Sequence, residues 1–304
     1  MPASSVNGHA FVVLAGGLAP AKMGTEKVVE ALQGTFRRDS YAPPMLPRVA
    51  MEILRFSQAP VTIELSRDVE PLLAEDPLLT AQILRAANAP AMGAKKPIRS
   101  IRQAVTRLGL RGLRDVVITV SLRSRVFRTP SYQAELDALF SHSMAMGTIS
   151  QQVAAATGGD ARFAYLCGLL SDLGIAASLL VFGELTEGPP PLFTLWPAML
   201  EVHEEAAAAV GQAWSLPEEV VAVIGAHHRS PSGPHAKLQS TLAVAEEIAV
   251  LLGQHLGCQD PSWAAFLSEE RFTSAREALK LSDAQFEAIL DSSARQLSPP
   301  KRVA

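Results

Sequence analysis

The chain has 304 residues, which is enough for one large or two ordinary domains. Hydrophobic residues make up 48% of the chain but aromatic residues only 6%, so the apolar content is mainly Ala, Leu and Val, which favours packed helices over a β-sandwich. The net charge of −3 does not point to any class of partner. Two distant cysteines, Cys167 and Cys258, form neither a disulfide framework nor a zinc pattern, and Cys167 is predicted to be a small core residue.

The N-terminal sequence does not resemble an export signal. No charged segment precedes the apolar patch from Ala10 to Ala15, so a signal peptide is not expected. No stretch reaches the ~20 uninterrupted apolar residues that a membrane span requires. The sequence therefore predicts a cytoplasmic protein.

The first 43 residues carry weak signals. A short strand is predicted at Phe11 to Leu14 and a helix at Thr25 to Phe36, and the pair Gly16-Gly17 is too isolated to indicate a phosphate-binding loop. The segment from Tyr41 to Pro47 contains three prolines, which predicts a linker into the main domain.

Helix signals begin after this linker. Asp76-Pro77 predicts an N-cap followed by proline at the first helical position. Ser100 and Gln103 form a capping-box pattern, and Gly109 is expected to end the helix that follows. The run from Val116 to Leu122 is β-branched, but the sequence around it offers no strand partner, so a buried helix is predicted there.

The remaining signals are also helical, and the fold class predicted from them is all-α. A second capping box, Ser215 with Glu218, is expected to start a helix that runs to about His227. A third, Ser282 with Gln285, is expected to start the last helix, which ends near Leu297. The other predicted helices are Ala134 to Ala156, Trp196 to Ala213 and Leu238 to Leu252, and the tail beyond Pro299 is expected to be disordered.

A polar pair, Ser171-Asp172, interrupts an apolar run from Phe163 to Phe182. The run is apolar on every helical face, so we expect a single buried helix. A buried carboxylate is costly unless it is paired, hydrogen-bonded or bound to a metal, so Asp172 requires a partner.

Four stretches of the chain carry a family likeness: Glu75 to Asn88, Ile98 to Gly109, the sequence Gly-Leu-Leu-Ser-Asp-Leu-Gly at 168–174, and Trp214-Ser-Leu-Pro217 followed by His227-His228. Together they resemble the HDOD domain, a degenerate relative of the HD metal phosphohydrolases found in bacterial signalling proteins. The resemblance covers about Leu46 to Leu252. It implies an HD-like bundle of two packed helical subdomains with a signalling role. The predicted domains are an N-terminal extension at 1–43, an HDOD domain at 44–255, C-terminal helices packed on it at 256–298, and a disordered tail at 299–304.

The same resemblance indicates which residues would form a metal site. His142 and Asp172 match two HD ligands, but Ser171 replaces the histidine of the His-Asp pair, and Glu246 stands where a distal aspartate is expected. Ile175 and the absence of a Gly-Tyr-Pro signature argue against the cyclic-dinucleotide-cleaving branch. No catalytic residue, metal or cofactor is therefore expected. His203, His227 and His228 lie where two-metal members of the superfamily have further histidines. If a metal is held, its ligands would come from His142, Asp172, His203, His227, His228 and Glu246.

Simpler interpretations exist for each of these residues. We expect His142 to pair with Asp172 without a metal, which would satisfy the carboxylate. His203 lies among glutamates and is expected on a solvated helix face, and Glu246 is equally compatible with exposure. His227-His228 would interact favourably with a helix C-terminus, and Trp214 is expected to be a packing anchor.

A basic stretch runs from Lys95 to Arg128, with Asp115 as its one acidic residue. It could attract an acidic partner, a nucleotide or nucleic acid, although a solvated face with salt bridges is the favoured interpretation. Phe127 is its one aromatic residue, which argues against stacking on single-stranded nucleic acid. The candidate anion-binding residues are Arg99, Arg102, Arg107, Arg111 and Arg114.

These observations predict a non-catalytic bacterial regulatory module. It would act by binding a signalling protein or a small effector, with a nucleotide as one candidate; neither nucleic acid nor a membrane is expected as a partner. Two alternatives remain open at this point: a metal-dependent phosphohydrolase with an altered HD site, and a nucleotide or nucleic-acid binder acting through the basic stretch.

Overall fold

The computed structural model describes residues 20–56, 76–89, 97–185, 189–254 and 268–297, together with residues 14, 16, 71 and 73. Every regular element in these ranges is a helix, so the predicted all-α class is confirmed. The chain divides into two compact units. Unit 1 comprises 1–43, 129–213 and 218–304, and unit 2 comprises 44–128 and 214–217.

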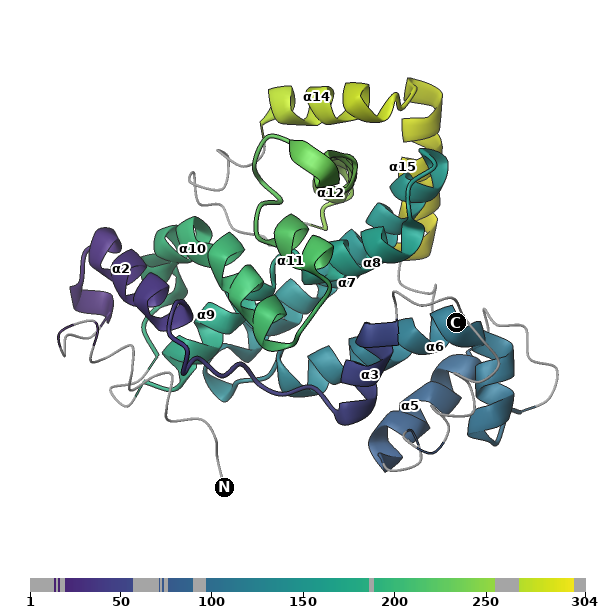
Figure 1. Cartoon of the computed structure of the whole chain (residues 1–304), viewed down its shortest axis with the longest axis horizontal. Helices are drawn as coiled ribbons and strands as arrows, with labels where there is room; N and C mark the ends of the chain where they lie inside the picture. Colours follow the sequence, from purple (N-terminus) through teal and green to yellow (C-terminus); the bar gives the residue numbers. More distant parts are fainter. Residues whose placement is uncertain are drawn as a thin grey trace, which may run out of the picture. The chain divides into compact units, whose positions relative to one another are not determined.

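Unit 1 contains most of the helices (Figure 1). Helix α7 packs along α8, α10 packs on α9 and α2, and α12 packs on α7 and α14. The elements in chain order are η1 (Pro20–Lys22), α2 (Thr25–Phe36), η3 (Pro130–Tyr132), α7 (Gln133–Ala156), α8 (Ala161–Leu170), α9 (Leu173–Gly183), α10 (Leu192–Ala213), α11 (Glu218–Ile224), η4 (Gly233–His235), α12 (Ala236–Leu251), α14 (Glu269–Leu279) and α15 (Asp283–Leu297).

Unit 2 is built on α3 (Arg48–Phe56), α5 (Pro77–Ala87) and α6 (Ile101–Arg125), with α3 and α5 both packed on α6. The β-branched run predicted as a buried helix lies inside α6, as expected. Gly109 interrupts α6 with a φ of 67°, a left-handed conformation that favours glycine, so the predicted helix end is present as a sharp kink. Trp214 is 1% exposed and its indole donates to the Pro44 carbonyl at 3.2 Å, in agreement with a packing role.

Three of the predicted caps form as expected. Asp76 accepts from the Leu79 amide at 2.9 Å, and Ser100 accepts from the Gln103 amide at 3.2 Å. At α15 the capping box is reciprocal, because the Gln285 amide donates to the Ser282 hydroxyl and the Ser282 amide donates to the Gln285 side chain. Short-range hydrogen bonds of this kind depend only on neighbouring residues.

Two local predictions are wrong. Ser215 does not cap α11: its φ is 53°, whereas an N-cap is extended, and the helix begins only at Glu218 and ends at Ile224. The apolar run from Phe163 to Phe182 is not one helix, because α8 ends at Leu170 and α9 begins at Leu173.

The run around this break is the centre of unit 1. The segment Ala161–Gly183 is the one segment among the described residues that is long and apolar enough to cross a membrane, and 89% of its most apolar window is buried inside the protein. Helices α7 and α10 pack against it, so its composition is that of core helices.

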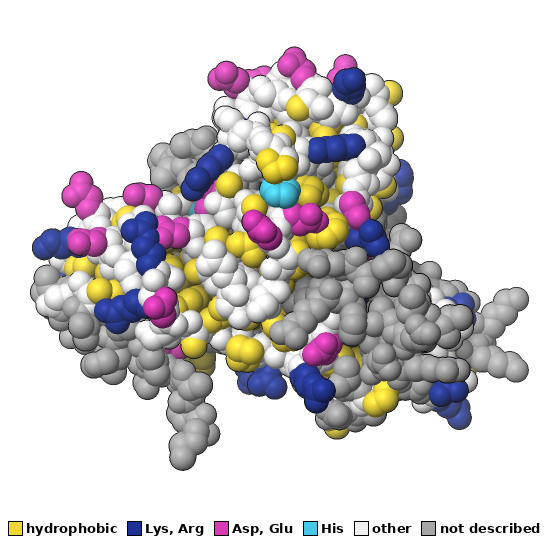
Figure 2. Space-filling model, in the orientation of Figure 1, with side chains coloured by type: hydrophobic (Ala, Val, Ile, Leu, Met, Phe, Trp, Pro, Cys, Tyr) yellow, Lys and Arg dark blue, Asp and Glu magenta, His cyan; other side chains and the backbone are white. Residues whose placement is uncertain are grey.

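The terminal helices also belong to unit 1. Helix α2 packs on α10, and Figure 2 shows side chains of both charges close together over these two helices, where Arg37 pairs with Glu205. Helices α14 and α15 pack on α12 and α7 respectively (Figure 1). The chain passes from unit 1 to unit 2 after residue 43, whereas residue 255 lies within unit 1. The predicted domain boundaries remain sequence-based predictions. Residues 11–13, 95–96, 258 and 298–304 lie outside the described residues, and so do the predictions made for them.

Candidate functional site

The break between α8 and α9 places a carboxylate in the core of unit 1. Ser171 ends α8, and its hydroxyl shares its single hydrogen between the Gly168 carbonyl at 3.1 Å and Asp172 Oδ2 at 3.0 Å. Asp172 lies at the N-cap position of α9 but makes no capping bond, and its side chain is 4% exposed. The chain turns here, so the carboxylate points out of the helix path toward α7, α10 and the segment after α11.

Two glycines on either side of Ser171-Asp172 allow the helices to approach closely. A Cβ on Gly168 would lie 2.5 Å from the Met146 carbonyl oxygen of α7, and a Cβ on Gly174 would overlap the His203 carbonyl oxygen of α10. No side chain fits at these separations. The Gly-Leu-Leu-Ser-Asp-Leu-Gly sequence therefore brings the backbone of α7 and α10, with their histidines, up to Asp172.

The His142–Asp172 contact that the sequence predicts is present. His142 lies on α7 with its side chain 4% exposed, and its Nε2 is 3.3 Å from Asp172 Oδ2. Its Nδ1 lies 2.6 Å from the Gln254 carbonyl oxygen. Burial alone would lower the pKa of His142, but the Asp172 carboxylate and the Gln254 carbonyl together raise it.

His227 lies near the same carboxylate, and His203 contacts His227. His227 Nε2 is 3.8 Å from Asp172 Oδ1 and 3.3 Å from His203 Nε2. Burial opposes the ionisation of Asp172, yet its contacts with His142 and His227 hold the pKa of the carboxyl well below its usual range. His203 is completely buried, so the prediction that it lies on a solvated face is wrong.

The tautomers of these three histidines follow from their second contacts. His142, His203 and His227 each place Nδ1 within 2.5–2.8 Å of a backbone carbonyl oxygen, those of Gln254, Leu200 and Ile224. A carbonyl only accepts, so each Nδ1 carries a hydrogen and each Nε2 faces inward. Neutral rings would then direct bare lone pairs at a carboxylate and at one another.

Protons on two of the rings resolve this conflict. Burial lowers the pKa of His227, but Asp172 raises it overall; for His203, burial and the neighbouring His227 lower the pKa to about 4. The raised pKa values of His142 and His227 therefore favour protonation of these two rings beside Asp172, whereas the lowered pKa of His203 favours its neutral form. A divalent cation could replace these two protons, because the same inward Nε2 lone pairs would bind it.

The turn that holds His227 and His228 is fixed by Glu204. This carboxylate accepts from the His228 amide at 2.8 Å and from the Arg229 guanidinium at 3.2 Å. The side chain of His228 is 4% exposed, and burial with two neighbouring histidines lowers its pKa well below the usual value. The expectation of favourable contacts between His227-His228 and a helix end is met only in part: His227 Nδ1 binds the carbonyl of Ile224, the last residue of α11.

Glu246 is buried, and its strongest partner is a cation from the C-terminal region. Arg271 Nη1 lies 2.7 Å from Glu246 Oε2, with side-chain exposures of 10% and 5%, and Arg271 Nη2 donates to the His227 carbonyl at 2.8 Å. His228 Nδ1 is 3.5 Å from the same carboxylate oxygen. Burial raises the pKa of Glu246 despite the arginine.

The residues do not fit the HD ligand set. Ser171 offers a hydroxyl where an imidazole is required, and Glu246 is bound to Arg271. A second set has the right chemistry for a transition metal: Asp172, His203, His227 and His228 each offer a ligand atom, all within 4.8 Å of one another, and Asp172 Oδ1 has no hydrogen-bond partner.

The basic stretch of unit 2 is less uniform than predicted. Arg99, Arg102 and Arg107 are exposed, but Arg114 is 6% exposed and ion-paired with Asp115 at 2.5 Å. Arg114 is therefore not part of an exposed anion-binding face, because it follows the kink at Gly109 and turns toward the unit's interior. The side chain of Arg111 lies outside the described residues.

The residues that hold the site together are not predicted from the sequence. Glu204 is one of several glutamates around His203, and nothing in the sequence near Arg271 or Gln254 marks them as contacts of a histidine. The burial of His203, which would have drawn attention to its neighbour Glu204, is itself known only from the structure.

Comparisons with known proteins agree with the resemblance noted above. The family profile of the HDOD domain matches residues 44–230. An uncharacterized protein of Treponema pallidum (strain Nichols) is 34% identical over 215 residues, which is 66% of this chain and 41% of that protein. The chain therefore spans less than half the length of this relative.

Solved structures show the same fold. An HDOD domain protein of unknown function from Geobacter sulfurreducens superposes with a TM-score of 0.62 at 25% identity, covering 88% of this chain and 94% of that one. A signal transduction protein from Marinobacter aquaeolei VT8, provisionally so named, superposes with a TM-score of 0.65 at 19% identity. This match covers 96% of this chain and 64% of that one. A protein from Shewanella amazonensis SB2B, provisionally named a metal-dependent phosphohydrolase, superposes with a TM-score of 0.60 at 19% identity. This match covers 88% of this chain and 99% of that one.

Proposed function

This chain belongs to the HDOD family, and from that membership and the chemistry of its buried centre we propose that it is a non-catalytic regulatory module. It would act by binding a protein partner or a small effector and by transmitting a change in helix packing. The name of the Marinobacter structure, a signal transduction protein, is consistent with such a role but describes that protein.

The observation that carries this proposal is the way in which the HD ligand positions are used. The Ser171 hydroxyl donates a hydrogen bond to Asp172, and the Arg271 guanidinium forms an ion pair with Glu246. A guanidinium thus provides the positive charge that a metal would provide at Glu246, and the raised pKa values of His142 and His227 favour protonated rings in the same role at Asp172. Such a network can hold helices α7, α9, α10, α12 and α14 in one arrangement without taking part in chemistry.

A second candidate function is favoured by one specific observation. The four donors Asp172, His203, His227 and His228 would hold a divalent metal, and a bound metal would activate water for phosphoester hydrolysis. In that case His142 and Arg271 would position the carboxylates, and the name of the Shewanella structure would describe this chain as well.

One experiment separates the two functions. The purified chain is supplied with Mn²⁺, Fe²⁺ or Zn²⁺, its metal content is measured by mass spectrometry, and hydrolysis of bis(p-nitrophenyl) phosphate is followed. We expect the rate to equal that of Asp172→Ala with each metal. A metal-dependent rate that Asp172→Ala abolishes, and that His235→Ala outside the cluster leaves intact, would overturn the non-catalytic proposal.

A further inference from the structure

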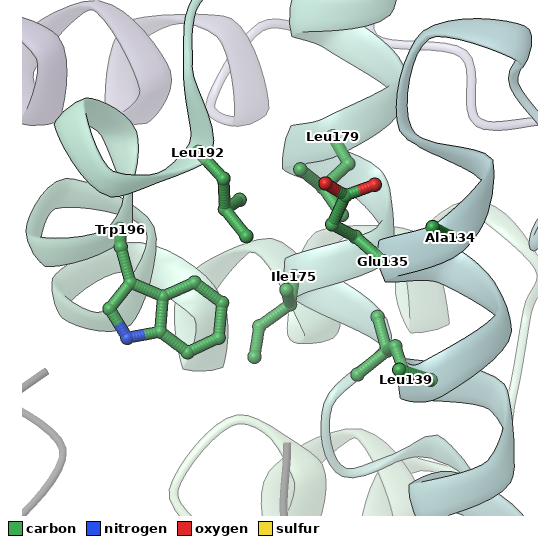
Figure 3. Close-up of a pocket in the computed structure, with 8 residues that line it drawn as sticks. Ala134, Glu135, Leu139, Ile175, Leu179, Leu192 and Trp196 are labelled. Atoms are coloured by element: carbon green, nitrogen blue, oxygen red, sulfur yellow. The ribbon is translucent and has the colours of Figure 1, made fainter. Parts of the chain in front are cut away.

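An apolar pocket lies at one end of the helices that carry the buried centre. It has a volume of about 250 Å³ and lies between α7, α9 and α10 of unit 1 (Figure 3). Ile175 and Leu179 come from α9, and Leu192 and Trp196 from α10. The α7 wall consists of Ala134, Glu135, Ala138 and Leu139. The volume is just below the range of about 300–1,000 Å³ that is usual for ligand pockets, which suits a small ligand.

The pocket contains one charged group, the carboxylate of Glu135. Figure 3 shows this side chain among the leucine and isoleucine side chains, opposite the Trp196 ring. No other side chain in the described part of the chain forms an ion pair or a hydrogen bond with it. Glu135 lies in the first turn of α7. A half-buried carboxylate that lacks a partner is a binding element for a cation.

The rim of the pocket exposes further apolar surface. Phe193 follows Leu192 on α10 and is 76% exposed, and it lies three residues before Trp196, on an adjacent part of the helix surface. Ala134 and Ala138 are exposed and small, so α7 leaves the mouth of the pocket open. An apolar ligand that enters the pocket would thus gain contact both inside and at the rim.

From these features we propose that the pocket binds a small amphiphilic cation: a compact apolar group that carries an ammonium nitrogen, with the nitrogen at Glu135 and the apolar part against Ile175, Leu179 and Trp196. The site is selective for charge because an anion would face Glu135 and a neutral ligand would leave this carboxylate without a partner.

The pocket and the buried centre use the same three helices. Glu135 and His142 are seven residues apart on α7, as are Trp196 and His203 on α10, so each pair lies on one helix face about 10 Å apart. On α9, Ile175 lies three residues after Asp172. A ligand that separates these helices in the pocket would also change the contacts of Asp172. This consequence rests on the proposed regulatory function, whereas binding itself does not.

The test uses the full chain and three probes of equal length: n-hexylammonium, n-hexanol and hexanoate. The chain has three tryptophans, so a spectrum of ¹⁵N-labelled indole groups contains three N–H signals, and Trp196→Phe assigns that of Trp196. We expect hexylammonium to shift the Trp196 signal saturably, with half-saturation at roughly 1–10 mM. Hexanol should bind about fivefold more weakly, and hexanoate more weakly still.

Three variants check the assignment. Glu135→Gln should remove the preference for hexylammonium over hexanol, whereas Asp137→Asn, which neutralises an exposed acid on the same helix, should keep it. Ala138→Phe should fill the pocket and abolish the response to all three probes; if this variant does not fold, the Glu135→Gln comparison decides.

Several results would overturn the proposal. These are no shift of the Trp196 signal with hexylammonium, equal binding of the three probes, or a preference that survives Glu135→Gln. A leucine- and lysine-containing peptide that binds here at tenfold lower concentration than hexylammonium would assign a protein partner instead. Failure of hexylammonium to bind leaves the regulatory proposal standing, whereas metal-dependent turnover would remove that proposal and leave the pocket intact.

Discussion

Replacing Arg271 with methionine tests the idea that a guanidinium takes the place of a metal at Glu246. Arg271→Met keeps most of the apolar stem but removes the contact at 2.7 Å and the bond to the His227 carbonyl. In this variant the Glu246 carboxylate either stays ionised, as a buried charge without a partner, or takes up a proton. Breaking a buried pair from one side costs about 3–5 kcal/mol.

Protonation sets an upper limit on this loss. Taking a carboxyl with an ordinary pKa of 4.5 to its neutral form at pH 7 costs roughly 3 kcal/mol, at 1.36 kcal/mol for each pH unit. Because burial already raises the pKa of Glu246 in the folded protein, we expect Arg271→Met to lose at most about 3 kcal/mol of unfolding free energy at pH 7. This loss comes from the cost of keeping Glu246 ionised or of protonating it, and protonation costs less at lower pH. The loss should therefore shrink as the pH falls toward 5. The measurement is urea unfolding followed by far-ultraviolet circular dichroism at both pH values.

The chain offers a matched control on the same helix. Arg276 pairs with Glu247 at 3.6 Å, and its side chain is 30% exposed, so Arg276→Met should cost no more than about 1 kcal/mol. The double variant Glu246→Gln with Arg271→Met should lose about 2 kcal/mol less unfolding free energy than the two single variants lose in total. The reason is that the double variant buries no unpaired charge. A loss for Arg271→Met that is no larger than that for Arg276→Met would refute the reasoning.

Three further predictions test the packing around the site. Gly174→Ala should destabilise by about 1–3 kcal/mol or more, because the new Cβ would lie against the His203 carbonyl, while Gly24→Ala, with open space around it, should lose only the ~1 kcal/mol or less that alanine costs at the N-cap of α2, as thermal unfolding would show. Asp160 caps α8 and the Arg162 guanidinium lowers its pKa, so Asp160→Ala should lose about 1 kcal/mol at pH 7; since the folded pKa is depressed, this difference should disappear as the pH falls below 3.8 in parallel urea titrations. Burial raises the pKa of the Cys167 thiol, so in a Cys258→Ser background the thiol should react with Ellman's reagent at pH 8 only after unfolding, and reaction of the folded protein would contradict its placement in the core.

The sequence by itself determined the all-α class, the starts of several helices and one partner of the site. Caps such as Asp76 and Ser282 act over three or four residues, so their patterns correctly located the starts of α5 and α15. The need of a buried Asp172 for a partner also followed from the sequence, because the cost of an unpaired carboxylate does not depend on the fold. The motif that carries the family resemblance specified the polar pair but not the break in the helix, since an apolar run has no local feature that opposes helix continuation.

Only the tertiary structure decided which of the polar side chains are buried and what they contact. His203 and Glu204 are neighbours in the sequence of α10, yet one is completely buried against α9 and the other holds the turn after α11. The partner of Glu246 comes from α14, 25 residues further along the chain. Helix periodicity defines the faces of a helix, but the neighbours of each face are chosen by packing between distant segments, and the charge of a histidine or a glutamate in the core depends on those neighbours.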